Sequence, residues 1–236
     1  MSRKSAPSRA GGRWLRWTLI IFAALLILPI AQVGCVRAVN PPLTPLMLVR
    51  EAEARINGKP APPRRYAWID FAQIPRPLLR CVLTSEDQRF FLHHGFDWKE
   101  MKIAQRDAER SGKPLRGAST ISMQCARSLF LWQGRSWVRK GLEAYYTFWM
   151  ELLLPKRRIL ELYANVIEMG DSVYGVEAAA QAHFGTSARG LKREQAALLA
   201  AILPNPRERN PRHPSPIVTA RAARILRDEP ALKVPL

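Results

Sequence analysis

Cysteine, acidic residues and strand-like patterns are all scarce in this chain of 236 residues. Its three cysteines, Cys35, Cys81 and Cys125, are too few and too scattered for a disulfide framework, and no Cys/His spacing is typical of a zinc site. Asp and Glu number 19 against 37 Lys and Arg, giving a formal net charge of +18. This surplus predicts an anionic partner: nucleic acid, anionic lipid headgroups or a phosphorylated substrate. No alternation of apolar and polar residues runs beyond a few positions, so we expect a mostly helical, all-α domain.

Charge is missing altogether from Trp17 to Val36, a nearly all-apolar run. About 20 such residues cross a bilayer as a helix. Residues 1–16 carry five cations and no acid, which leaves +13 for the rest of the chain. This positive flank predicts that the N-terminus stays in the cytoplasm and that the body lies across the membrane, which argues against nucleic acid as the partner. A cleaved signal peptide is the alternative, although the run is long for one and no A-x-A site follows it.

These features divide the chain into four parts. Residues 1–16 form a basic cytoplasmic tail, 17–36 a transmembrane signal-anchor helix, 37–76 a proline-rich tether and membrane-proximal lobe, and 77–236 a helical domain. Periodicity and capping signals predict a short helix in the tether and a series of helices after it. Their expected ranges are Met47–Ile56, Pro77–Thr84, Trp98–Arg110, a segment following Ser119 and Thr120, Trp137–Leu154, Lys156–Met169 with Gly170 as its C-cap, Gly175–His183, Arg193–Leu203 and Pro214–Arg227.

The stretch from Thr84 to Asp97 places Glu86 and two aspartates among phenylalanines and histidines. A carboxylate beside apolar rings is poorly solvated, its pKa rises, and it can act as a general acid or base near neutral pH. The alternative is a solvated turn beside core aromatics. Glu86 falls at the end of the helix predicted for Pro77–Thr84, where a side chain can face a cleft.

Two further segments carry candidate anion ligands. Ser119 and Thr120 can cap a helix whose N-terminus attracts an anion and whose side presents Gln124 and Arg127, although an ordinary capped helix explains the same residues. On the next helix, Arg139 and Lys140 precede Glu143 by four and three residues, so all three share a face. This arrangement is either a surface ion pair or a carboxylate flanked by phosphate ligands. The rest of that helix is largely apolar, so we expect it to be substantially buried, and its few charged residues then face a cleft.

Five segments in order resemble the motifs of glycosyltransferase family 51, and most closely its monofunctional biosynthetic transglycosylases. The pattern E-D-x-x-F-x-x-H-x-G-x-D matches Glu86–Asp97, and G-[GA]-S-T-I-[TS]-x-Q matches Gly117–Gln124. R-K-x-x-E matches Arg139–Glu143, K-x-x-I-L-E-x-Y-x-N-x-x-x-x-G matches Lys156–Gly170, and a fifth region runs from Gly175 to Pro206. The resemblance covers residues 40–228. It departs from the family pattern at Met123 and Cys125, and at Arg127 and Ser128, where Lys-Asn is common.

The resemblance implies a lysozyme-like helical lobe with a smaller, partly membrane-embedded lobe. It implies an inverting transfer of a glycan, held as a lipid-linked pyrophosphate, onto the 4-hydroxyl of a lipid-linked disaccharide-pentapeptide. Glu86 becomes the catalytic base and Glu143 the second catalytic carboxylate, which either orients cations or holds a divalent ion such as Mg²⁺ or Mn²⁺. The implied substrate-binding residues are Ser119, Thr120, Gln124, Arg127, Arg139, Lys140 and Asn165. Asp87, His93 and Asn165 are equally compatible with structural roles.

Two other classes of protein stay open at this point. A wall-cleaving, lysozyme-like enzyme would use similar carboxylates but would not need the Arg139 and Lys140 face, because no pyrophosphate leaves. An inactive scaffold for wall synthases would keep the motifs without the chemistry. The body contains no S-x-x-K or K-T-G sequence, so a penicillin-binding transpeptidase domain is not expected. We therefore expect a single-pass protein of the bacterial inner membrane, with its catalytic domain on the periplasmic side, that binds lipid-linked precursor and leaves cross-linking to other cell-wall synthases.

Overall fold

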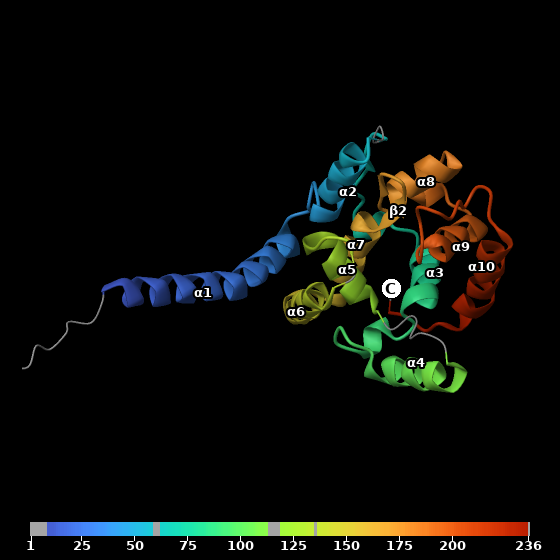
Figure 1. The fold of residues 1–236 in the computed structure, drawn as a ribbon. Helices are drawn as coiled ribbons and strands as arrows, with labels where there is room; N and C mark the ends of the chain where they lie inside the picture. Colours follow the sequence, from blue (N-terminus) through green and yellow to red (C-terminus); the bar gives the residue numbers. More distant parts are fainter. Residues whose placement is uncertain (1–8, 59–61, 113–118, 135, 236) are drawn as a thin grey trace, which may run out of the picture.

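The computed structural model of the chain describes residues 9–58, 62–112, 119–134 and 136–235. One long helix, α1 (Arg9–Ala38), extends away from a helical body (Figure 1). The body contains α2 (Pro45–Ile56), α3 (Arg76–Glu86), α4 (Trp98–Ser111), α5 (Ile121–Phe130), α6 (Trp137–Leu153), α7 (Lys156–Val166), α8 (Val176–Phe184), α9 (Arg193–Ile202) and α10 (Pro216–Asp228). Short 3-10 turns lie at Phe71–Gln73, Phe90–Leu92, Ala188–Gly190 and Glu229–Ala231. The predicted all-α class is confirmed.

Side-chain caps set where several of these helices begin. Thr120 accepts from the backbone N–H of Met123 at the start of α5, and Ser136 accepts from that of Arg139 at the start of α6. Each cap satisfies a backbone donor that has no partner inside its helix. These observed helices therefore begin within a residue or two of the positions that the sequence predicted.

The prediction for Lys156–Met169 was wrong at its end. Helix α7 stops at Val166, and Met169 and Gly170 belong to strand β2 (Glu168–Gly170). This strand lies antiparallel to β3 (Val173–Tyr174), which pairs in parallel with β1 (Arg65–Tyr66). The chain after β3 returns to this end of α7: Gly175 N–H donates to the carbonyl of Ile167, and a Cβ on Gly175, whose φ is +80°, would lie 2.4 Å from the carbonyl oxygen of Asn165. Such short strands carry no alternating pattern long enough to detect in a sequence.

Two groups of helices build the main core. Helix α5 is buried along most of its length and packs against α6 and α7, while α3 packs against α9 and α9 against α10. Four small side chains on α9, at Ala196, Ala197, Ala200 and Ala201, are fully or almost fully buried and let the neighbouring helices approach closely. The last residue of α3, Glu86, consequently lies beside Gln124 of α5, where the two groups of helices join.

The tether region is folded against the body. Leu46 and Met47 of α2 are almost fully buried and pack with Tyr174 of β3 in a small second cluster. Helix α2 also contacts α5. The predicted helix in this region is confirmed, and the boundary that we place at residue 76 stays a prediction.

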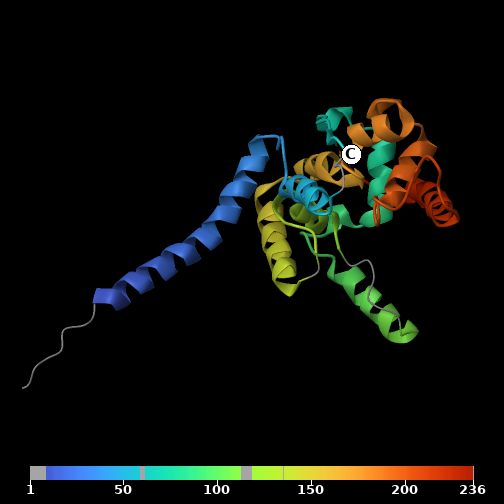
Figure 2. The same ribbon diagram turned by 45° about the horizontal axis from the view of Figure 1, so that its top comes forward.

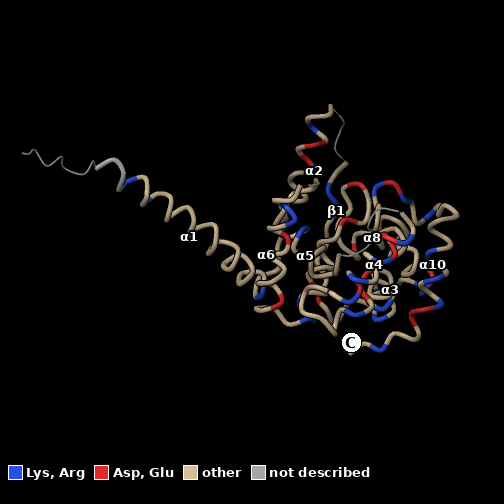
Figure 3. The backbone as a smooth tube through the Cα atoms, turned by 60° about the horizontal axis from the view of Figure 1, so that its bottom comes forward, with Lys and Arg blue, Asp and Glu red and all other residues tan. Residues whose placement is uncertain are grey.

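Helix α1 is apolar enough and long enough to cross a membrane over Arg13–Ala38. Only 17% of its most apolar window is buried against the rest of the protein, which distinguishes it from a core helix. Figure 3 shows that charged residues concentrate on the body and leave most of α1 without charge. The helix therefore fits a single-pass membrane anchor.

Candidate active site

Glu86 is the last residue of α3, and its side chain opens into a pocket of about 260 Å³. One carboxylate oxygen, Oε1, accepts hydrogen bonds from Ser85 Oγ and Arg221 Nη2, both at 2.9 Å. The other, Oε2, accepts from Gln124 Nε2 at 3.1 Å. The carboxylate is thus fixed on two sides while 11% of the side chain stays exposed. A base that must reach a substrate hydroxyl needs this combination of fixed orientation and access.

The surroundings of Glu86 correct the expectation of an aromatic environment. The pocket is lined by polar and charged residues: Thr84, Ser85, Glu86, Asp87, Gln88, Arg89, Asp97, Glu100, Ser119 and Thr120. Phe90 is fully buried and packs edge-on against Phe91, with the ammonium of Lys156 4.3 Å from its ring centroid. Phe90 and Phe91 belong to the core, because apolar rings gain more from burial than from lining a polar pocket.

Sequence reasoning missed Arg221. It lies on α10, 135 residues after Glu86, and its Nη2 donates to Ser85 Oγ at 2.8 Å as well as to Glu86. A single arginine in an amphipathic C-terminal helix carries no signal that it reaches a carboxylate so far away. Packing of α10 against α9 and α3 brings it there. The guanidinium thus helps to fix the carboxylate of Glu86 in one orientation.

Glu143 forms the second centre, and it is completely buried. Its Oε2 lies 2.6 Å from Arg139 Nη1 and 3.7 Å from Arg127 Nη1, and its Oε1 lies 2.6 Å from Lys140 Nζ. The i,i+3 and i,i+4 contacts on α6 are those that the spacing predicted. Three cations around one carboxylate leave a net positive cluster, which suits a pyrophosphate. Because both oxygens already have cationic partners, Glu143 fits the role of orienting these cations and does not fit a divalent metal ligand.

Gln124 and Ser119 connect the two centres. The amide nitrogen of Gln124 donates to Glu86 and, at 3.3 Å, to the backbone oxygen of Ser119, while its amide oxygen accepts from Tyr163 at 3.0 Å. Lys140 Nζ reaches Ser119 Oγ at 3.4 Å. An unbroken series of contacts therefore runs from Glu86 to the cationic cluster, although the two glutamates are far apart in sequence. Gly117 and Ala118 of the same motif lie outside the described residues.

A second pocket, of about 200 Å³, begins on the other side of Gln124. Its walls come from α2, α5, the segment around β2 and the loop after α9, and its lining includes Arg50, Gln124, Arg127, Glu168, Asn205 and Arg207. Gln124 lines this pocket, and its amide nitrogen donates to Glu86, which lines the first pocket. The site thus offers two spaces that are linked by the hydrogen bond between Gln124 and Glu86.

Two predicted substrate ligands have other contacts in the structure. Thr120 is buried, and its hydroxyl donates to the carbonyl of Gly95 at 2.6 Å while it caps α5. Asn165 is fully buried, and its amide accepts from the N–H of Ile69 and donates to the carbonyls of Ile69 and Glu161. With its hydrogen-bonding groups occupied, Asn165 holds the segment after β1 to α7. We therefore favour a structural role for it, and substrate binding by this residue stays a prediction.

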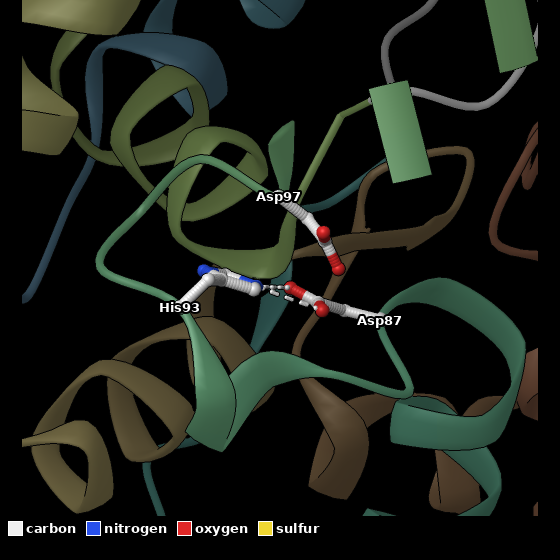
Figure 4. Close-up of side chains that lie close together, drawn as sticks. All are labelled: Asp87, His93 and Asp97. Carbon is white, nitrogen blue, oxygen red and sulfur yellow. Dashed lines mark hydrogen bonds and ion pairs between the residues drawn. The ribbon is translucent and has the colours of Figure 1, made fainter. Parts of the chain in front are cut away.

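Asp87, His93 and Asp97 lie close together (Figure 4), in an arrangement that could hold a metal ion. Their ligand atoms are already engaged. Both carboxylate oxygens of Asp87 contact His93 Nε2, at 3.0 and 3.1 Å, and one also accepts from the N–H of Ile121. Asp97 accepts from Arg89 and caps α4. These residues therefore fit a structural role, fastening the loop to the start of α5, better than a metal site.

Comparisons with known proteins agree with this geometry. The family model described as "Transglycosylase" matches residues 54–229. The chain is 46% identical over 237 residues to a biosynthetic peptidoglycan transglycosylase of Xanthomonas euvesicatoria pv. vesicatoria, covering 99% of this chain and 94% of the relative. A protein of the same description from Xylella fastidiosa (strain M12) is 48% identical over 214 residues, covering 91% and 88%. A third, from Xanthomonas axonopodis pv. citri, is 46% identical over 228 residues, covering 95% and 91%.

Proposed function

The chain belongs to the transglycosylase family, and on this premise we propose that it is a peptidoglycan glycosyltransferase that extends glycan strands. The donor is the growing glycan on a lipid pyrophosphate, and the acceptor is the 4-hydroxyl of a lipid-linked disaccharide-pentapeptide. The observation that carries the proposal is the pairing of two different centres: an accessible, oriented carboxylate at Glu86 and a buried glutamate that gathers three cations.

Glu86 accepts the proton of the acceptor hydroxyl as the hydroxyl oxygen bonds to the anomeric carbon of the donor sugar. The bond from that carbon to the pyrophosphate oxygen breaks in the same displacement, so the configuration at the carbon inverts. Arg139, Lys140 and Arg127 stabilise the negative charge that builds on the departing pyrophosphate. Glu143 touches no reacting atom in this scheme. It is a positioning residue that fixes the cations in advance, and charge stabilisation is most effective when the charges need not reorganise.

The two pockets support a reaction between two sugars. Glu86 lines one of them, and Gln124, whose amide orients Glu86, lines the other. We place the donor and the acceptor in these two spaces, one on each side of the contact between Glu86 and Gln124. A hydrolase would need only a water molecule on the second side. It would also have no use for the cluster around Glu143, since no pyrophosphate leaves in hydrolysis.

The anchor gives the enzyme the same location as its substrates. We propose that α1 spans the bacterial inner membrane with the N-terminus in the cytoplasm and the body on the periplasmic side, because cations precede the apolar run. Enzyme and lipid-linked precursor then meet by diffusion within one membrane. Other wall synthases are proposed as partners, because a chain without S-x-x-K and K-T-G needs a separate transpeptidase for cross-linking.

The test is polymerisation of lipid-linked disaccharide-pentapeptide by the purified, detergent-solubilised full chain. We expect polymer from the wild type and from Glu109→Gln, a surface carboxylate bonded to Gln105 on α4, and none from Glu86→Gln. We also expect polymer to persist in EDTA, because the oxygens of Glu143 already hold cations. Folded wild type that makes no polymer would refute the function, and cleavage of finished glycan strands would then favour a wall-cleaving enzyme. Full activity of Glu86→Gln would refute the assignment of the base.

A further inference from the structure

The most exposed side chains of helix α6 are apolar. Trp137 is 92% exposed, Val138 72%, Leu152 61% and Phe148 53%. The charged residues Arg139 and Glu143 of the same helix are buried on the side that faces the cleft. An exposed apolar strip of this length marks contact with a partner or a lipid phase, because it is costly to leave in water. The helix therefore separates an apolar medium from the proposed pyrophosphate site.

Contacts with α1 indicate that the apolar medium beside α6 is the lipid bilayer. Tyr145 donates to the carbonyl of Leu26, and Arg37 donates to the carbonyl of Leu153, both within 2.9 Å. The two contacts follow the same order in both helices, so α6 runs in the same general direction as α1. Its first residues therefore point in the same general direction as the N-terminal end of α1 (Figure 2). If α1 spans the bilayer, α6 lies beside the C-terminal half of the apolar span, and its exposed apolar face is turned toward lipid.

An open concavity of about 340 Å³ lies at the start of α6, lined by Ser136, Trp137, Arg139 and Lys140. It combines an almost fully exposed indole with the two cations that contact Glu143 at 2.6 Å. A ligand that satisfies both features carries a strong anion directly attached to a hydrocarbon chain. Polyprenyl pyrophosphate has this chemistry. A phospholipid shares it in part, since its phosphate is also close to its acyl chains.

We propose that Trp137 forms a subsite for the first isoprene units of the lipid-linked substrate, next to the pyrophosphate that Arg139 and Lys140 hold. This inference rests on the proposed function and extends it to the lipid part of the substrate. The pyrophosphate binds the cations, while the isoprene units beside it pack on the indole face and remain continuous with the bilayer. The subsite then selects prenyl pyrophosphates over anions that have no chain. It also explains why α6 places its cations directly after an exposed tryptophan.

The test compares binding of two probes to the full-length chain in detergent: geranylgeranyl pyrophosphate and inorganic pyrophosphate. For Trp137→Ser we expect the Kd for geranylgeranyl pyrophosphate to rise about tenfold, the order expected when a partly buried apolar contact is lost. The Kd for inorganic pyrophosphate should not change, and Trp137→Phe should recover most of the affinity. Phe148→Ser is the matched control, because it removes an exposed aromatic from the same helix face outside the concavity. It should bind both probes as the wild type does.

Each contrary outcome is distinct. Equal weakening by Trp137→Ser and Phe148→Ser would overturn the local subsite in favour of a general lipid-facing surface. An unchanged Kd for geranylgeranyl pyrophosphate in Trp137→Ser would overturn it outright. Effective competition by phosphatidylglycerol micelles would assign the concavity to bilayer phospholipid instead. If the wild type binds geranylgeranyl pyrophosphate as expected but makes no polymer, the proposed function fails while the subsite stands.

Discussion

Replacement of Arg221 by glutamine tests whether the C-terminal helix takes part in catalysis. Its Nη2 donates to Glu86 Oε1 at 2.9 Å and to Ser85 Oγ at 2.8 Å. A hydrogen bond to a charged group contributes about 1.5–3 kcal/mol. The Arg221 side chain is 34% exposed, so solvent screening reduces this to about 1–2 kcal/mol. If that energy orients Glu86 in the transition state, kcat for polymerisation falls about 5- to 30-fold.

Steady-state polymerisation of lipid-linked disaccharide-pentapeptide measures this effect. Arg221→Lys should recover part of kcat, since it keeps the charge but loses the forked donor geometry. Arg227→Gln is the control, because that side chain is 71% exposed and pairs only with the adjacent Asp228. Wild-type kcat in Arg221→Gln would refute the reasoning.

Three other predictions follow from buried groups. Glu143→Gln leaves Arg139 and Lys140 without their counter-charge, so we expect no polymer. The unfolding free energy should fall by about 2–3 kcal/mol, after allowance for the partly exposed Lys140. Wild-type thermal stability of this variant would contradict the prediction. Asn165→Ala removes three buried hydrogen bonds, so the unfolding free energy measured by thermal unfolding should fall by about 2–4 kcal/mol while KM stays unchanged. A raised KM at normal stability would instead indicate that Asn165 binds substrate. Burial raises the pKa of Cys81 to about 12 and also raises that of Cys125, so both remain thiols at pH 8. Iodoacetamide should therefore label only the exposed Cys35 until the protein is denatured. Mass spectrometry of the labelled, folded protein measures this, and labelling of Cys81 or Cys125 would contradict it.

Local sequence signals were reliable wherever the interaction is local. Thr120 and Ser136 cap the helices that follow them, and the cations at i and i+1 contact Glu143 at i+4, because these geometries depend on only one helical turn. The end of α7 was predicted wrongly, because the close approach of Gly175 to Asn165 depends on how two later segments fold back. For Asn165 the motif implied a substrate contact and left a structural role equally open; its full burial favours the structural role, and substrate binding by this residue stays a prediction.

The all-α class, the apolar anchor, the order of the motifs and the chemical types of the two centres could all be predicted from the amino-acid sequence. These properties follow from composition, from helical periodicity and from residues that lie within a few positions of one another. The folded structure was needed to show that Gln124 and Ser119 bridge Glu86 to the cations, that Arg221 reaches the base from α10, and that polar groups rather than phenylalanines line the pocket. Such contacts join residues tens to more than a hundred positions apart. They exist because helix packing brings distant side chains to one place, and no local pattern in a single sequence records where that packing occurs.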